Sequence, residues 1–232
     1  MSSKIIHVLC EGQTEQGFVE TVLKPYLLDK GIDAVKSVLV TTNKKLNARG
    51  GILKYEYAIR DLELLKKTFV DGQYERHIFT TMFDLYALPT DFPGYKEAIT
   101  KMDKYERVKT LEEAFAKDCD DARFIPYIQL HEFEALVFCG LSFLKDLYPK
   151  CKVGYRELEN TLLCQPNPEL INTNPDKAPS KRIIKAIETD SKSLYRYNKP
   201  RTGKYVTEKV GIEELRSKCK HFSDWIDNLI DK

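Results

Sequence analysis

Carboxylate side chains directly follow three strand-like segments of this sequence. Glu11 follows the first segment, Asp84 follows the third, and Glu132 and Glu134 follow the last, with His131 beside them. Carboxylates that are brought together repel one another, and a hard divalent cation among them relieves the repulsion. Such a cation can polarise a phosphodiester, generate a hydroxide and hold the leaving oxygen. We therefore expect Glu11, Asp84 and Glu132 to bind Mg²⁺ or Mn²⁺, since no spacing of histidines and cysteines indicates zinc.

Each of these residues also has a plainer interpretation. Glu11 can be a solvated turn residue, and Asp84 can cap a helix or turn. Glu132 and Glu134 would point the same way on a strand but about 200° apart on a helix, so both cannot bind one ion if a helix has begun. Glu132 is then the expected ligand, and Glu134 supports or replaces it. His131 is expected to act as a general acid or to bind phosphate, or else to be hydrogen-bonded in the sheet rim.

The segment from Glu11 to Glu15 is the sharpest local signal. Gly12 permits a tight turn from strand to helix, Thr14 can cap the helix, and Glu15 complements its positive N-terminus. This turn would hold Glu11 at the rim of the sheet. A lysine or arginine paired with Glu11 or Asp84 would argue against the metal site.

The elements that must position these residues follow from the hydrophobic pattern. Segments with alternating apolar residues indicate strands at 4–10, 34–42, 76–83 and 123–130. Helical periodicity indicates helices at 15–30, 55–69, 105–119, 135–144 and 221–230, with Pro25 kinking or shortening the first. Repeated βα units of this kind predict an α/β fold with a mostly parallel sheet flanked by helices. Ligands bind outside the carboxyl ends of the strands in such sheets, where the acidic residues stand.

Basic residues are concentrated in one part of the chain. Residues 150–204 carry 12 lysines and arginines against 6 acidic residues, whereas residues 1–149 carry 20 against 23. We expect a catalytic core at 1–149 and a largely helical basic appendage at 150–232, packed together as one compact unit. Arg49, Lys54, Lys181 and Arg182 are the expected phosphate clamps, and the tyrosines among the basic residues can stack on bases. A solvated face or a surface for a protein partner would have much the same composition.

The overall composition is that of an ordinary globular protein. The chain has 232 residues, 42% of them hydrophobic, and a formal net charge of +2. From the residues at its N-terminus we expect no secretion signal, and its longest apolar stretch is about half of what a bilayer span needs. Its six cysteines form no C-x-x-C pair. We expect a cytoplasmic protein with reduced thiols that does not enter a membrane.

Several motifs, in order along the chain, resemble a Toprim-like family long catalogued as a domain of unknown function. They are Val8 to Glu15, Arg49-Gly50-Gly51 with Lys54-Tyr55, Met82 to Tyr86 with Leu88-Pro89, Arg123 to Leu136, Ala178 to Arg182, and His221-Phe222 with Trp225. The resemblance covers nearly the whole chain. It implies a metal-dependent Toprim core, as in topoisomerases, primases and nucleases of the overcoming-lysogenisation-defect type.

This resemblance also implies roles for single residues. Glu11 matches the Toprim glutamate after the first strand, and Asp84 matches the first aspartate of the later Asp-x-Asp motif. The second aspartate is replaced by Tyr86, and Glu132 or Glu134 is expected to supply the missing ligand. Some relatives resemble the nuclease subunit of the PARIS anti-phage system, which implies an ABC-type ATPase partner and a transfer RNA target.

The resulting hypothesis is a Mg²⁺- or Mn²⁺-dependent nuclease acting on nucleic acid, RNA in preference to DNA, in prokaryotic anti-phage defence. Two alternatives remain open. One is a Toprim-like shell that has lost catalysis and serves as a regulatory or binding subunit of an ABC-type ATPase. The other is a phosphotransfer enzyme acting on nucleotides, which needs the acidic residues but not the basic appendage. A homodimer is compatible with all three.

Overall fold

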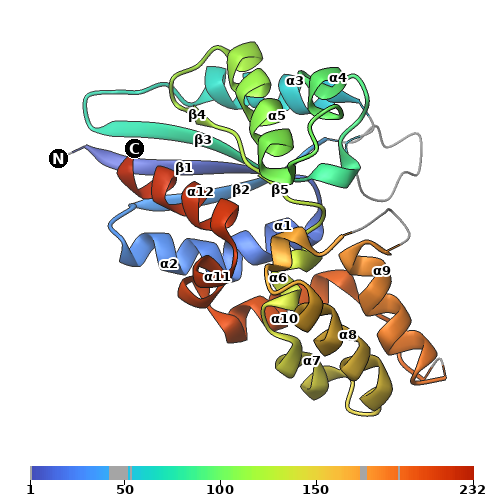
Figure 1. The fold of residues 1–232 in the computed structure, drawn as a ribbon. Helices are drawn as coiled ribbons and strands as arrows, with labels where there is room; N and C mark the ends of the chain where they lie inside the picture. The colour runs from blue at the N-terminus through green and yellow to red at the C-terminus, as the bar shows by residue number, and fades with distance from the viewer. Residues whose placement is uncertain (1, 42–51, 53, 173–176, 193) are drawn as a thin grey trace.

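The computed structural model of this chain describes residues 2–41, 52, 54–172, 177–192 and 194–232. A parallel sheet forms its centre, as predicted (Figure 1). The strands run in the order β2 (Ala34–Leu39), β1 (Ser3–Cys10), β3 (Glu75–Asp84) and β4 (Phe124–Ile125), and β5 (Ile128–Gln129) pairs with the end of β3. Because Cys10 lies beside Met82 in the register of β1 and β3, the residues that follow both strands emerge at the same edge.

Strand β1 separates two hydrophobic cores, because alternate side chains of a strand point to opposite faces. Val8 and Cys10 pack into the core that contains Phe18, whereas Leu9 packs into the core that contains Phe115. Both faces of the sheet are therefore covered. Such burial explains why β1 reads as a nearly continuous apolar run.

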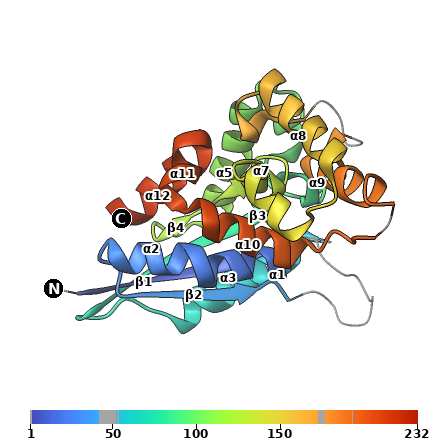
Figure 2. The same ribbon diagram turned by 90° about the horizontal axis from the view of Figure 1, so that it is seen from below.

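Helices cover the two faces of the sheet (Figures 1 and 2). One face carries α3 (Tyr55–Thr68), α4 (Tyr95–Ala98) and α5 (Lys104–Cys119), and the other carries α1 (Gln13–Phe18), α2 (Lys24–Asp29) and α12 (Lys220–Asp231). The remaining helical segments are η1 (Val19–Leu23), η3 (Leu85–Ala87), α6 (Glu134–Phe138), α7 (Leu141–Leu147), α8 (Lys152–Cys164), η4 (Pro168–Leu170), α9 (Pro179–Ile184), η6 (Lys185–Thr189), α10 (Lys199–Val210) and α11 (Ile212–Lys218).

Three predicted elements differ in detail from the structure. The first helix is not broken at Pro25: a single π-helical turn, η1, precedes the proline and accommodates its missing N–H, and the helix continues to Asp29. Strand four is divided into β4 and β5, because Pro126 between them cannot donate to the ladder. The predicted helix at 135–144 is likewise two helices, α6 and α7, which meet at Gly140.

Helices from the C-terminal third pack directly on the sheet and its first helix. Trp225 of α12 stacks on Tyr127 with ring centroids 4.1 Å apart, and its indole N–H donates to the Thr80 hydroxyl at 2.8 Å. Gly203 of α10 lies so close to α1 that an added Cβ would be 3.0 Å from Thr14 Cγ2. The same hydrophobic core therefore contains residues from both sides of position 150. No helix in the described ranges has the length and apolar character needed to cross a bilayer.

Candidate active site

Glu11 and Asp84 lie side by side at the carboxyl ends of β1 and β3. The Glu11 carboxylate accepts a hydrogen bond from the Asp84 backbone N–H at 2.9 Å. The Glu11 N–H in turn donates to the Met82 carbonyl at 3.2 Å. The parallel register of β1 with β3 thus places both acids where the sequence pattern predicted them.

Two further acids complete a cluster around Asp84, which is itself buried. Glu15 stands in the first turn of α1 and is 4% exposed, and Glu134 begins α6 and is fully buried. The Glu15 carboxylate reaches back over the turn, since a Cβ at Gly12 would lie 3.2 Å from Glu15 Oε2. We refer to Glu11, Glu15, Asp84 and Glu134 as the acidic cluster.

Lys199 at the start of α10 provides positive charge within the acidic cluster. Its Nζ atom lies 3.3 Å from Asp84 Oδ2 and 3.1 Å from Glu134 Oε2. The remaining carboxylate oxygens have other donors: the Phe133 N–H donates to Asp84 Oδ1 at 2.8 Å, and the Tyr197 hydroxyl donates to Glu134 Oε1 at 3.1 Å. An ammonium group therefore bridges two of the acids, one of which is Asp84. A lysine paired with Asp84 is the arrangement that was expected to argue against a metal site.

The electrostatics show that one lysine does not balance the cluster. Burial, followed by the charge of Asp84, raises the pKa of Glu15 to about 7 against the opposing effect of Lys199. Burial likewise raises the pKa of Glu134 to about 7 and is the largest cause of the raised pKa values of Glu11 and Asp84. Burial alone would lower the pKa of Lys199, but Asp84 and Glu134 raise it above its usual range. The lysine is thus charged, while each acid remains costly to ionise.

The donor set of the acidic cluster fits a hard divalent cation. All four groups are carboxylates, which Mg²⁺ and Mn²⁺ prefer. Their pKa values are raised first by burial and then by neighbouring negative charge, and bound positive charge would offset both effects. In the described residues, however, no three His, Cys, Asp or Glu side chains are already arranged around one ion position. Lys199 holds the positive charge there instead, so cation binding requires its side chain to move.

Glu132 is held by α9, although its charge still raises the pKa of Asp84 and of Glu134. Its Oε2 atom accepts a hydrogen bond from the Ser180 N–H at 2.9 Å. Helix α6 begins at Glu134, so the two glutamates diverge as expected for a helix that has started, and Glu134 is the one that reaches Lys199. Its contact with Ser180 brings Glu132 next to Lys181 and Arg182, the predicted phosphate clamps.

Lys181 and Arg182 line a cavity of about 230 Å³, together with Lys177, Lys185 and Glu157 among others. The Arg182 guanidinium is positioned by the Lys177 carbonyl, to which Nε donates at 2.8 Å. This cavity lies along α9, whose first turn contacts Glu132.

The other predicted site residues have different surroundings. Lys54 precedes α3, is exposed and pairs with Glu56 at 3.7 Å. Arg49 lies outside the described residues. Thr14 does not cap α1: the N-cap residue is Gly12, and the Thr14 side chain is buried against α10. Because Thr14 lies two residues after the N-cap position, it cannot serve as the cap, and packing explains this residue better.

His131 has an unusual conformation beside the acidic cluster. Its φ is 63°, in the left-handed region that residues other than glycine rarely adopt. The side chain is 1% exposed, and its ring lies 5.2 Å from the Tyr86 ring. Burial, followed by the charges of Lys104 and Arg107, lowers the pKa of His131 to about 4. The imidazole is therefore neutral at physiological pH.

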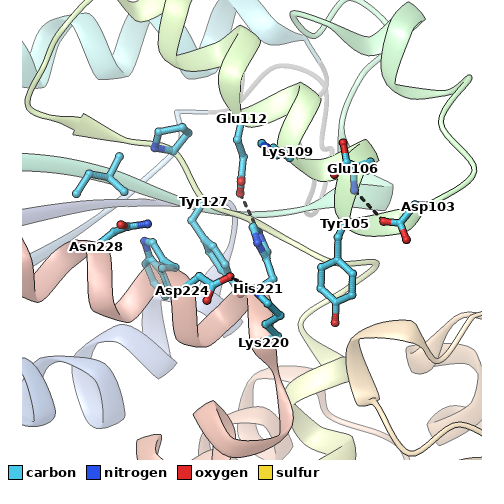
Figure 3. Close-up of a pocket in the computed structure, with 13 residues that line it drawn as sticks. Asp103, Tyr105, Glu106, Lys109, Glu112, Tyr127, Lys220, His221, Asp224 and Asn228 are labelled. Carbon is cyan, nitrogen blue, oxygen red and sulfur yellow. Dashed lines mark hydrogen bonds and ion pairs between the residues drawn. The ribbon is translucent and has the colours of Figure 1, made fainter.

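A separate cavity of about 770 Å³ lies between α5 and α12 (Figure 3). A half-buried ion pair crosses it, in which His221 Nε2 lies 2.9 Å from Glu112 Oε1. No member of the acidic cluster lines this cavity. Its size is therefore no evidence that this cavity binds a substrate of the acidic cluster.

Sequence reasoning missed Lys199 as a member of the site. The segment Asn198-Lys199-Pro200 does signal a helix start, because Asn198 caps α10 through the Arg201 N–H at 2.9 Å and proline suits the first turn. Nothing in that signal shows where the helix docks. Lys199 was therefore counted only as one charge in a basic segment.

Comparison with known proteins places these features in a family. A family model described as a domain of unknown function, DUF4276, matches residues 10–230. The chain belongs to the DUF4276 family. No curated protein matches it. Among solved structures, the C-terminal region of the Xanthomonas campestris pv. campestris OLD protein is similar, with 18% sequence identity, coverage of 98% of this chain and 95% of that chain, and a TM-score of 0.37.

Proposed function

We propose that this DUF4276 protein is a Mg²⁺- or Mn²⁺-dependent nuclease. The observation that carries the proposal is the convergence of four carboxylates at the carboxyl ends of β1 and β3, three of them buried and Glu11 half-buried, with pKa values raised by burial and mutual repulsion. Such a cluster is costly for a fold to maintain, and costs of this kind are typical of functional sites. When bound, the cation would polarise the phosphodiester and lower the pKa of water.

The residues of the chain have distinct parts in this proposal. Glu11, Asp84 and Glu134 would hold the cation, with Glu15 adding negative charge from the first turn of α1. Gly12 keeps the turn open for the Glu15 carboxylate, since any larger residue would crowd it. Glu132 is held by α9 and links the cluster to the basic cavity at Lys181.

The substrate we propose is nucleic acid, with RNA such as transfer RNA favoured over DNA. Lys181, Arg182 and Lys185 present positive charge next to the segment that contacts Glu132. A phosphate backbone bound there would extend toward the acidic cluster. A role in prokaryotic anti-phage defence, with an ABC-type ATPase as partner, is part of the same proposal and derives from the family resemblance.

One observation favours a second candidate function. Lys199 pairs with both Asp84 and Glu134 and so occupies the position that the cation would need. If the Lys199 ammonium always neutralises these two acids, no divalent cation binds there, and the protein is a non-catalytic regulatory subunit. The two candidates differ in whether a divalent cation can displace the lysine.

Cleavage of a mixture of RNA and DNA, with Mn²⁺ or with EDTA, tests the proposal. We expect Mn²⁺-dependent cleavage that Glu11→Gln abolishes, since the amide keeps the shape of the side chain but loses its charge. Glu20→Gln is the matched control, because Glu20 lies in the helical segment that follows Glu11 but pairs with Lys24 at the surface. Full activity in Glu11→Gln would contradict the assignment, and tight partner binding without turnover would select the non-catalytic candidate.

Neutralising the basic cavity distinguishes polymer from nucleotide substrates. Lys181→Gln combined with Arg182→Gln should weaken cleavage of RNA and reduce its dependence on salt. Hydrolysis of a mononucleotide should hardly change, because one phosphate does not reach both sites. An effect of equal size on both substrates would argue against a nucleic-acid path along α9.

A further inference from the structure

A second group of polar side chains surrounds His131, on the β5–α6 connection next to the acidic cluster. Among the described residues, neither ring nitrogen of His131 has a hydrogen-bond partner, although both are buried. A neutral imidazole has one N–H donor and one acceptor nitrogen, so the fold leaves both unpaired. Buried polar groups are normally paired, and exceptions need an explanation. The left-handed backbone at this residue adds strain at the same position.

Two cations lie near this ring without a carboxylate partner. Lys104 and Arg107 stand one turn apart at the start of α5, both are half-buried, and the charges of both act on His131. In the part of the chain that the structure describes, neither forms an ion pair with an acid. Arg107 donates to the Lys101 carbonyl at 2.8 Å, while its Nε–H is buried without a partner. Positive charge and unused donors therefore coincide here.

Tyr86 lies between the buried His131 ring and the solvent. Its N–H donates to the His131 carbonyl at 3.1 Å, and its side chain is 42% exposed above the imidazole. The acids of the same turn of α5, Asp103 and Glu106, line the cavity toward α12. Glu132 is the acid whose charge acts on Tyr86, which connects this group to the candidate active site.

We propose that Lys104, Arg107, His131 and Tyr86 form a binding site for a phosphate group. The guanidinium and ammonium supply charge-assisted donors, and the imidazole N–H and the tyrosine hydroxyl supply neutral ones, for the several acceptor oxygens of a phosphate. Binding requires the exposed Tyr86 side chain to turn so that its hydroxyl and the buried His131 ring both face the phosphate. If the phosphate belongs to an RNA, it lies next to the phosphodiester that is cleaved. This identification of the ligand as RNA rests on the proposed function.

Histidine side-chain NMR tests the site directly, because the chain has only four histidines. The protein is titrated with inorganic phosphate in EDTA, and with chloride at equal ionic strength as a control for screening. We expect the His131 imidazole signals, assigned with His131→Gln, to move saturably with phosphate and not with chloride. Arg107→Gln should weaken the apparent affinity about tenfold or more. Lys109→Gln is the matched control, since Lys109 lies on the same helix and pairs with Glu113.

Other outcomes are equally decisive. Equal responses to chloride and phosphate, or unchanged phosphate affinity in both Arg107→Gln and Lys104→Gln, would overturn the site; the second variant decides if the first does not fold. A short RNA that moves the same signals and competes with phosphate identifies a backbone source, whereas a response to phosphate alone identifies a free phosphate. Because EDTA removes divalent cations, failure of the proposed nuclease function would leave this result unchanged.

Discussion

Replacing Lys199 with methionine tests the electrostatic balance of the acidic cluster. Methionine keeps most of the length and apolar body of the side chain but removes the charge. The ammonium lies 3.3 Å from Asp84 Oδ2 and 3.1 Å from Glu134 Oε2. At an effective dielectric constant of about 20, each contact is worth roughly 5 kcal/mol before desolvation is subtracted.

Desolvation and solvent screening reduce this value. The Lys199 side chain is 36% exposed, whereas those of Asp84 and Glu134 are 6% and 0% exposed. Breaking a buried pair by removing one partner costs about 3–5 kcal/mol, and partial exposure places this case at the lower end. We therefore expect Lys199→Met to lower the free energy of unfolding by about 3 kcal/mol in EDTA. Lys204→Met, at an exposed position of the same helix, should change it by less than about 0.5 kcal/mol.

Urea unfolding with EDTA and with Mn²⁺ measures both halves of this prediction. Without the lysine, a divalent cation meets no competitor, so Mn²⁺ should stabilise Lys199→Met more than the wild type. A cation at 100 times its dissociation constant contributes about 2.7 kcal/mol. The reasoning is refuted if Lys199→Met unfolds like the wild type in EDTA, or if Mn²⁺ stabilises neither protein.

Three further predictions concern other parts of the fold. The raised pKa of Glu15 means that its contribution to stability is present below pH 4.5 and lost as pH rises through about 7. In EDTA and above pH 7, Glu15→Gln should therefore be more stable than the wild type by up to about 3 kcal/mol. A difference in stability that stays constant across pH would contradict this. Burial, followed by the charge of His77, lowers the pKa of His7 to about 4, so wild-type stability should fall between pH 6.5 and 4 by about 3 kcal/mol more than that of His7→Phe in denaturant titrations; parallel pH curves would exclude this cause. Gly154→Ala should lower the free energy of unfolding by about 3 kcal/mol or more, because its Cβ would lie 2.1 Å from the Ala186 carbonyl oxygen. Gly17→Ala has open space around the added Cβ and should raise the free energy of unfolding by about 0.5–1 kcal/mol. Thermal melts that rank the two variants in the opposite order would refute the packing argument.

Hydrophobic periodicity was sufficient to predict the sheet and most of its helices. The apolar run before Glu11 indicates a strand that is buried on both faces, and the periodic apolar residues from Tyr55 indicate a helix that is buried on one face. The structure buries both segments in this way. Boundaries failed where one residue changes the backbone, as at Pro126 and Gly140. At Gly140 an added Cβ would lie 2.4 Å from Val210 of α10, a contact between segments distant in sequence that no local pattern can reveal.

The candidate site was only partly predictable for the same reason. Glu11 and Asp84 meet because parallel strands end at one edge, a rule that applies to any such sheet. Lys199 arrives from 115 residues beyond Asp84 through the docking of α10. Glu15 stands in the first turn of α1 as expected, but packing also buries it and adds its charge to the cluster, which the pattern did not show. The position of Lys199 and the burial of Glu15 both depend on how the helices dock, which hydrophobic periodicity does not show.

Diffraction from crystals soaked in Mn²⁺ and measured for anomalous scattering is the most direct test of the acidic cluster. We predict an ion bound by oxygen atoms of Glu11, Asp84 and Glu134, with the Lys199 ammonium moved out of its contacts with Asp84 and Glu134. A cluster that binds no Mn²⁺, with Lys199 still in contact with both acids, would contradict the proposed catalytic function.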